Sequence, residues 1–213
     1  FPLVSRLIQE GNIETLGRLN IKIMTLFFLI SLPIAVGGFL LAQPIITFIY
    51  GFHYLLAASA FQILIFNILF SFPTGFLNNI VLGYDQQKRL IVFVAVSAIF
   101  SFSLNALLIP TYGMQGASLA LLISQSFYFL AVLWYVQRII HFSFLSRLPV
   151  IILATFLMGI TSLSLLFFHT PLLLIILFSA CVYFVILLYF REPVLMEMIQ
   201  SSKRFSFFSR FIP

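Results

Sequence analysis

The sequence predicts an all-α integral membrane protein with six transmembrane helices. Of its 213 residues, 62% are hydrophobic and only 8% are charged, whereas a soluble domain carries about 25% charged residues. The mean hydropathy of +1.18 exceeds what the core of a soluble domain of this size can bury. Six apolar runs are long enough to cross a bilayer as helices, and none alternates as a barrel strand would.

Each apolar run has a defined place in the chain. The predicted helices span about residues 23–42, 56–82, 90–109, 114–136, 148–168 and 171–190. Gln43 and Pro44 break the chain after the first helix. Pro110 is expected to end the third helix because proline lacks an N–H, and Gly113 suits the reversal that follows. Pro33 and Pro73 fall inside helices, where they fit either a packing kink or a hinge for movement.

The positively charged residues alternate between connections. All 11 Lys and Arg residues lie in four segments: 1–22, 84–89, 137–147 and the tail after 190. The connections near 43–55, 110–113 and 169–170 contain none. Under the positive-inside rule, both ends of the chain lie in the cytoplasm and the neutral connections lie outside. The basic residues are dispersed, so we expect membrane lipid and no nucleic acid as a partner.

Polar residues recur at helical spacing in two of the predicted helices. They are Asn67, Ser71, Thr74 and Asn78 in the second helix, and Ser97, Ser101 and Asn105 in the third. At 100° per residue each set shares one face. Such a face either lines a hydrated cavity or packs helices closely in lipid. Two asparagines at membrane depth need hydrogen-bond partners, so Asn67, Ser71, Thr74, Asn78 and Asn105 are candidate cavity-lining residues.

Small residues at the same spacing indicate close helix packing. Gly116, Ala120 and Ser124 form such a stripe in the fourth helix, and small residues let helix backbones approach in lipid. We therefore expect these three residues to pack against another helix. A similar set, Thr155, Gly159 and Ser162, occurs in the fifth helix, and the same interpretation applies there.

The sequence holds no motif for catalysis, a cofactor or a metal. No ionisable residue lies deep in a predicted helix, where it would mark a proton or ion path. His53, His141 and His169 are isolated, and no ligand spacing joins them to a cysteine or a carboxylate. No nucleophile elbow, phosphate loop or carboxylate pair is present. We therefore expect no enzyme, no cofactor and no metal site.

Four segments resemble the polysaccharide flippases of the Wzx type. The run NALLIPTYGMQGA, from Asn105 to Ala117, is similar to the family's N-x-x-L-I-P-x-Y-G-x-x-G-A pattern. The segments at 1–11, 44–54 and 82–88 are also similar to family patterns, although Asp85 stands in a region where glycine is usual. The resemblance covers about residues 1–140, and the last two helices are too generic to compare.

The resemblance implies the later part of a longer exporter. Members of the multidrug/oligosaccharidyl-lipid/polysaccharide exporter superfamily have about 12 to 14 helices in two lobes around a central cavity. Residues 1–140 would belong to the C-terminal lobe, 141–190 to two further helices, and 191–213 to a basic cytoplasmic tail. Because the chain begins with Phe1, we expect a missing N-terminal lobe as a further partner.

The resemblance also implies a function in the cytoplasmic (inner) membrane. The family flips a polyprenyl-linked oligosaccharide across that membrane by alternating access, for surface polysaccharide biosynthesis. Export of drugs or of another lipid-linked precursor is the alternative, and a membrane-bound polymerase or acyltransferase is a more distant one. Five cations are expected on the cytoplasmic side: Arg6, Arg18, Lys22, Lys88 and Arg89. They either contact the anionic head group of the substrate or only set the topology of the chain.

Overall fold

The protein is helical throughout the part that the structure describes. The computed structural model describes residues 8, 13–168 and 170–196, and every regular element there is an α-helix or a 3₁₀-helix. Five of these helices are long and apolar enough to cross a membrane. These observations confirm an all-α membrane fold. The chain forms two compact units, Phe1–Phe144 and Leu145–Pro213.

The first long helix begins before the apolar run that predicted it. Helix α2 spans Ile13–Leu40, so the expected start at residue 23 was wrong. Glu14, Arg18 and Lys22 follow one another at intervals of four residues and share an exposed face, while Leu16 and Asn20 are buried. An amphipathic helix of this kind continues past the apolar run. Pro33 lies inside α2.

A short helix and a turn follow α2, in a stretch of sequence, 41–56, that contains no lysine or arginine. Helix α3 spans Ala42–Tyr50 and η1 spans Phe52–Tyr54. The two are separated by Gly51, whose φ of 87° suits glycine, which has no Cβ. Tyr50 and Tyr54 pack against each other with ring centroids 6.0 Å apart.

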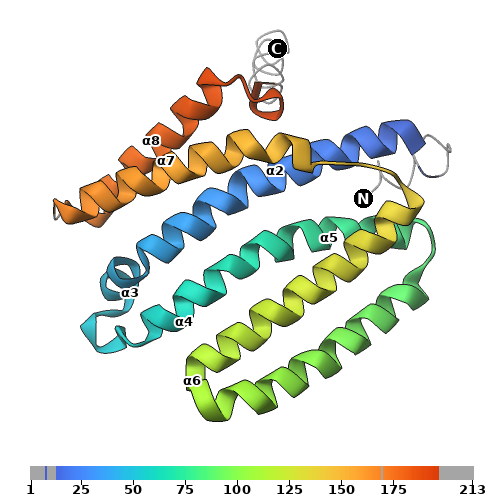
Figure 1. The fold of residues 1–213 in the computed structure, drawn as a ribbon, viewed down its shortest axis with the longest axis horizontal. Helices are drawn as coiled ribbons and strands as arrows, with labels where there is room; N and C mark the ends of the chain where they lie inside the picture. Colours follow the sequence, from blue (N-terminus) through green and yellow to red (C-terminus); the bar gives the residue numbers. More distant parts are fainter. Residues whose placement is uncertain (1–7, 9–12, 169, 197–213) are drawn as a thin grey trace, which may run out of the picture. The chain divides into compact units, whose positions relative to one another are not determined.

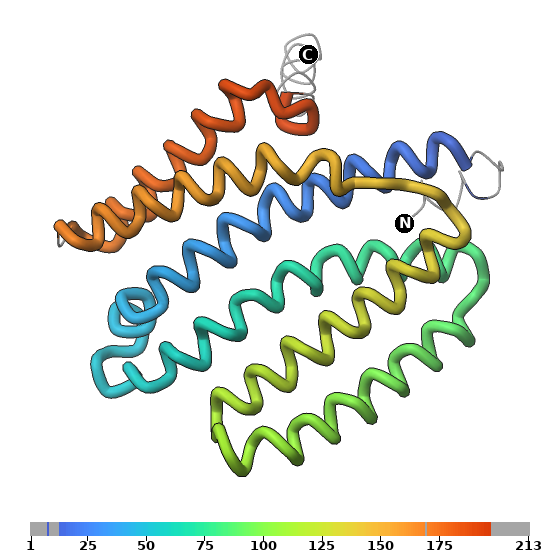
Figure 2. Tube along the Cα trace, viewed as in Figure 1, coloured from blue at the N-terminus to red at the C-terminus, as the bar shows by residue number. Residues whose placement is uncertain are grey.

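The second predicted helix, about 56–82, is confirmed as one helical span, Ala57–Gly83. A 3₁₀ segment, η2 (Ile65–Asn67), lies between its two α-helical parts, α4 (Ala57–Leu64) and α5 (Ile68–Gly83). A tight contact accompanies η2, because a Cβ on Gly38 of α2 would lie 2.7 Å from the Ile65 side chain. Helix α2 therefore packs closely against this segment (Figure 2).

The third and fourth predicted helices form one hairpin. Helix α6 spans Gln87–Ile139 and reverses at Gly113, whose φ of 55° and ψ of −127° are not helical. Figure 1 shows its two halves side by side. Each half, 87–112 and 114–139, is about 39 Å long at 1.5 Å per residue, enough to cross a bilayer. Pro110 lies inside the first half, so the expectation that it ends the helix was wrong.

The second unit is a helix pair. It contains η3 (Leu145–Arg147), α7 (Leu148–Phe167) and α8 (Leu172–Tyr189). The Ser162 and Ser179 hydroxyls lie 2.8 Å apart and are both buried. This hydrogen bond joins α7 to α8 at membrane depth, which is where polar contacts between helices stabilise a membrane protein.

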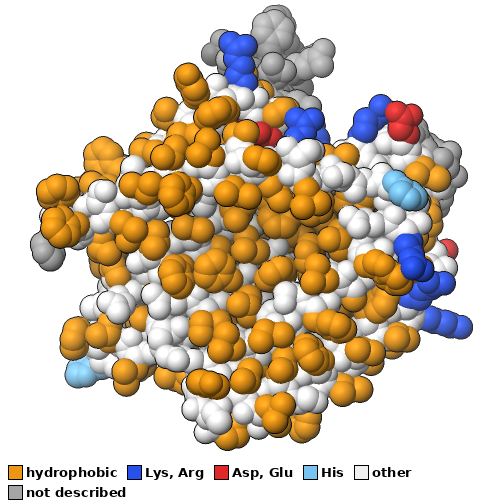
Figure 3. Space-filling model, in the orientation of Figure 1, with side chains coloured by type: hydrophobic (Ala, Val, Ile, Leu, Met, Phe, Trp, Pro, Cys, Tyr) orange, Lys and Arg blue, Asp and Glu red, His pale blue; other side chains and the backbone are white. Residues whose placement is uncertain are grey.

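Large apolar side chains are exposed on every long helix. Examples on α6 are Ile99 at 69%, Phe102 at 77% and Leu107 at 69% exposure. Figure 3 shows hydrophobic side chains over most of the face that it draws. In water such a surface would be an aggregation site, whereas in lipid its exposure carries no unfavourable hydration free energy. The protein is therefore a multi-pass protein embedded in a membrane.

Candidate functional site

Polar side chains of α5 and of the two halves of α6 meet where these segments come together. Helix α5 packs against α6. The Tyr128 hydroxyl of the second half donates a hydrogen bond to Asn78 Oδ1 of α5 at 3.2 Å. The Ser97 hydroxyl of the first half donates to the backbone carbonyl of Ser124 at 3.3 Å. These two bonds join three helical segments that are far apart in the sequence.

A pocket of about 270 Å³ lies between the two halves of α6. Three of its eight side chains are apolar, and the other five carry a hydroxyl or an amide. They are Val94, Ser97, Ala98, Ser101, Leu121, Ser124, Gln125 and Tyr128. We call this space the hairpin pocket. Its lining holds no charged group, so it offers only neutral hydrogen-bond donors and acceptors.

The local helix geometry explains how the hairpin pocket arises. Ser97 and Ser101 are one turn apart on the first half, and Ser124 and Tyr128 are one turn apart on the second, so each pair shares a face. The reversal at Gly113 brings the two faces together. Small side chains at Ser97, Ala98 and Ser101 leave space that larger residues would fill.

Two predicted cavity residues lie beside the hairpin pocket. Asn78 reaches it through its hydrogen bond with Tyr128. The Asn105 amide lies one turn beyond Ser101 and donates to the Ser101 carbonyl at 2.8 Å. Neither asparagine is part of the lining itself, but each forms a hydrogen bond with a residue that is, Asn78 with Tyr128 and Asn105 with Ser101.

The other predicted cavity residues lie elsewhere on the second span. Thr74 is 3% exposed and its hydroxyl donates to the Phe70 carbonyl at 2.6 Å. The Ser71 hydroxyl donates to the Asn67 carbonyl at 2.9 Å. Such bonds to the preceding turn satisfy a hydroxyl within its own helix. Asn67, Ser71 and Thr74 are thus not among the residues that line the hairpin pocket.

Sequence reasoning missed Tyr128 and Gln125. Tyr128 lies among phenylalanines in an apolar run, and Gln125 follows Ser124 directly, so neither belongs to a stripe of small residues. The usable signal was the position of Tyr128, which lies one helical turn beyond Ser124. A hydroxyl at that depth needs a partner, and the structure provides Asn78.

The predicted packing residues bring the two halves of α6 together near the reversal. Gly116, Ala120 and Ser124 are all buried. A Cβ on Gly116 would meet the Leu108 carbonyl oxygen and would lie 2.6 Å from the Leu108 carbonyl carbon. The Ser124 hydroxyl donates to the Ala120 carbonyl at 2.6 Å. The stripe thus faces backbone of the first half at Gly116, where only glycine fits.

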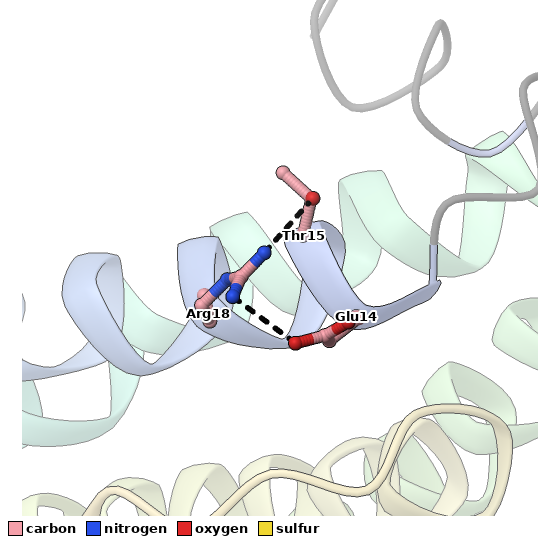
Figure 4. A network of polar contacts seen from close by, with 3 residues as sticks. All are labelled: Glu14, Thr15 and Arg18. Atoms are coloured by element: carbon pink, nitrogen blue, oxygen red, sulfur yellow. Dashed lines mark hydrogen bonds and ion pairs between the residues drawn. The ribbon is translucent and has the colours of Figure 1, made fainter.

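The described cations of the first unit gather at one end, where α2 begins and where α6 begins and ends (Figure 3). Arg18 forms an ion pair of 3.0 Å with Glu14 and lies 3.5 Å from the Thr15 hydroxyl (Figure 4). Because Glu14 and Arg18 are exposed, the pair contributes at most about 0.5 kcal/mol. We call this part of the first unit the cation-rich end.

Two further arginines at the cation-rich end rest on aromatic rings. The Arg89 guanidinium carbon lies 4.8 Å from the centre of the Tyr135 ring, and that of Arg138 lies 3.9 Å from the Trp134 ring. Cation–π contacts of this kind hold a cation near an interface. Lys22 and Lys88 are exposed, and Arg6 lies outside the described residues.

Glu192 is a buried carboxylate just after α8. Its side chain is 3% exposed, and Oε1 has no hydrogen-bond partner among the described residues. Burial raises the pKa of this carboxyl above its ordinary value, and the charge of Arg147 partly opposes that increase. The described residues contain no group of three or more His, Cys, Asp or Glu that could hold a metal ion.

The comparisons with known proteins place the chain among membrane proteins. No family model matches the chain. Over 163 residues, 76% of the chain, it is 27% identical to "Uncharacterized membrane protein MJ1068" of Methanocaldococcus jannaschii. The matched region covers 32% of that protein, so the chain spans about a third of the length of this relative.

Proposed function

We propose that this chain is part of a transporter that flips a polyprenyl-linked oligosaccharide across a membrane by alternating access. The observation that carries the proposal is the α6 hairpin. Its reversal is built from the run that resembles the flippase pattern, and its two halves flank an open pocket whose lining includes four hydroxyls and one amide beside three apolar side chains. Neutral groups of this kind suit the hydroxyls of a sugar.

The distribution of charge supports a division of roles within the substrate path. The hairpin pocket holds no charge, so it has no group to neutralise a diphosphate. The cation-rich end holds Arg18, Arg89 and Arg138, which attract anionic head groups electrostatically. In this proposal the sugar contacts the neutral pocket, while the diphosphate stays near the cations or meets residues of another lobe.

The orientation and the membrane are also part of the proposal. We infer that the cation-rich end faces the cytoplasm, because lysine and arginine are retained on that side during insertion. The membrane is then the cytoplasmic membrane, with the Gly113 reversal on its outer side. We infer no enzymatic activity, because the hairpin pocket holds neither a general base nor a metal ligand set.

A deletion of the full-length gene tests the proposed function. We expect surface polysaccharide to be lost and the lipid-linked oligosaccharide to accumulate on the cytoplasmic face, because its synthesis continues while its translocation stops. Normal surface polysaccharide with no accumulated intermediate would contradict the proposal. Altered drug sensitivity in the same strain would instead favour a drug exporter of the same superfamily.

A filled pocket provides a sharper test in the same strain. Ala98 lines the hairpin pocket and has a small side chain, so Ala98→Phe places a large ring in the space. Complementation by this variant should fail although the protein is present in the membrane. Phe102→Leu, one turn along at 77% exposure, is the matched control and should complement fully.

A further inference from the structure

Three polar residues in the first unit carry buried side-chain atoms without a hydrogen-bond partner among the described residues. Asn20 lacks one for both Nδ2 and Oδ1, Ser31 for Oγ, and Asn67 for Oδ1. Asn20 and Ser31 are 0% exposed. A buried polar atom without a hydrogen bond loses the free energy of its hydration. Four such atoms in one unit therefore require an explanation.

Asn20 and Ser31 lie on one line along α2. At 100° per residue, Asn20, Ser31 and Gly38 point within about 20° of one another. The Gly38 end of this line packs on η2, because a Cβ on Gly38 would lie 2.7 Å from the Ile65 side chain. Phe27, on the same side, packs on Phe72 at 6.3 Å. The line therefore faces the second span.

Asn67 belongs to the same contact between helices. Helices α2 and α5 run in opposite directions side by side (Figure 2). Gly38 faces Ile65 and the two helices are antiparallel. Ser31, about two turns before Gly38 on α2, therefore lies opposite about Ser71, which is about two turns after Ile65 on the second span. The Ser71 hydroxyl donates to the Asn67 backbone carbonyl at 2.9 Å, and the Asn67 side-chain oxygen has no partner among the described residues. We call this contact the α2–α5 seam.

Neighbouring hydroxyls show that the unpaired atoms are not a general feature of these helices. Thr25 donates to the Ile21 carbonyl at 2.7 Å, and Thr74 donates to the Phe70 carbonyl at 2.6 Å. Ser31 makes no such bond. The Asn20 amide needs an acceptor and a donor at once, which no apolar neighbour can supply.

We propose that the α2–α5 seam binds internal water at its unpaired polar atoms, with sites at Asn20, Ser31 and Asn67. Water donates and accepts hydrogen bonds, so it satisfies both ends of the Asn20 amide. A seam joined by water exchanges its hydrogen bonds more easily than one joined by direct contacts. If the proposed alternating-access function holds, this seam is a place where α2 moves against α5.

Radiolytic labelling of the full chain tests the water at Asn20 without any transport assay. X-rays convert bound water to hydroxyl radicals, which oxidise a neighbouring methionine to its sulfoxide. Met24 lies one turn beyond Asn20 and is 0% exposed. Met158 of α7, at 5% exposure, is the buried control, and Met114, at 59%, is the exposed one.

We expect Met24 to be oxidised several-fold faster than Met158, despite its lower exposure. Asn20→Leu should slow the oxidation of Met24 and leave that of Met114 unchanged, because the variant removes the groups that hold the water. The proposal is overturned if Met24 reacts no faster than Met158, or if its rate in Asn20→Leu equals that of the unaltered chain.

The site at Ser31 is tested by a small substitution. If water binds the Ser31 hydroxyl, Ser31→Ala removes a hydrogen bond and lowers the Tm of the chain. If the seam is dry, the same change removes an unpaired polar atom, and the Tm stays or rises, which would overturn the proposal at this site. Ser103→Ala is the matched control, because the Ser103 hydroxyl is exposed and donates within its own helix to Ile99 at 2.9 Å. Its Tm should not change.

Discussion

A methyl group at Gly116 should force the two halves of α6 apart. In Gly116→Ala the new Cβ would lie 2.6 Å from the Leu108 carbonyl carbon and 3.1 Å from the Ile109 nitrogen. Carbon atoms pack best at about 3.5 Å or more, so the first contact is short by about 1 Å. Both neighbours are backbone, and no side-chain rotation relieves the contact. The hairpin must therefore open at this point.

Gly75→Ala is the matched control that isolates this steric effect. Gly75 is exposed on α5, and nothing lies within 4 Å of its added Cβ. Alanine favours a helix over glycine by at most about 1 kcal/mol, and both variants share this gain. Overpacking typically costs about 1–3 kcal/mol. The difference between the two variants should therefore be about 1–3 kcal/mol, with Gly116→Ala the less stable.

Thermal unfolding of the purified chain in one detergent measures the difference. At about 2–4 °C per kcal/mol for a chain of this length, the Tm of Gly116→Ala should lie about 2–12 °C below that of Gly75→Ala by circular dichroism. A Tm for Gly116→Ala equal to or above that of Gly75→Ala would refute the close approach of the two halves.

Three further predictions follow from the described contacts. Tyr128→Phe should lower stability by about 0.5–1.5 kcal/mol through loss of its bond to Asn78, and should have no such effect in an Asn78→Leu background; an equal loss in both backgrounds would exclude the bond as the cause. Burial raises the pKa of Glu192 above the value of about 4.3 that it has in the unfolded chain. Between these two values the folded chain binds more protons than the unfolded chain, so the Tm should fall as pH rises through this window. Glu192→Gln should remove that slope and raise the Tm at neutral pH, and a slope that persists would show that another group causes it. With Cys181→Ala as background, a cysteine at Tyr112 should react with an impermeant maleimide on intact cells while a cysteine at Lys88 should not, and the reverse pattern would invert the proposed orientation.

The apolar runs predicted the spans well because lipid imposes length and composition on a helix. Two boundaries failed for local reasons. Helix α2 begins at Ile13, because hydropathy marks where a helix enters lipid and not where its hydrogen bonds begin. Pro110 stays helical, because a proline removes one hydrogen bond without preventing helical φ, whereas Gly113 can adopt the φ of 55° that the reversal needs.

The candidate site was less predictable than the fold. Spacing placed Ser97 and Ser101 on one face of their helix, and Ser124 with Gly116 and Ala120 on one face of the next, because residues one turn apart share a helix face. Spacing cannot show which two faces meet. That depends on the Gly113 reversal and on the packing of α5 against α6, which bring Tyr128 to Asn78. The 3₁₀ segment at Ile65–Asn67 had no sequence signal either, and it accompanies a tertiary contact, that of Gly38 with Ile65.

The most direct test of the central claim is a translocation assay with the full-length protein in liposomes. A fluorescent polyprenyl diphosphate oligosaccharide is placed in the inner leaflet, and its arrival in the outer leaflet is followed with an impermeant quencher. We predict that the protein accelerates this transfer and that Ala98→Phe abolishes the acceleration. Transfer that is no faster than in protein-free liposomes would contradict the proposed flippase function.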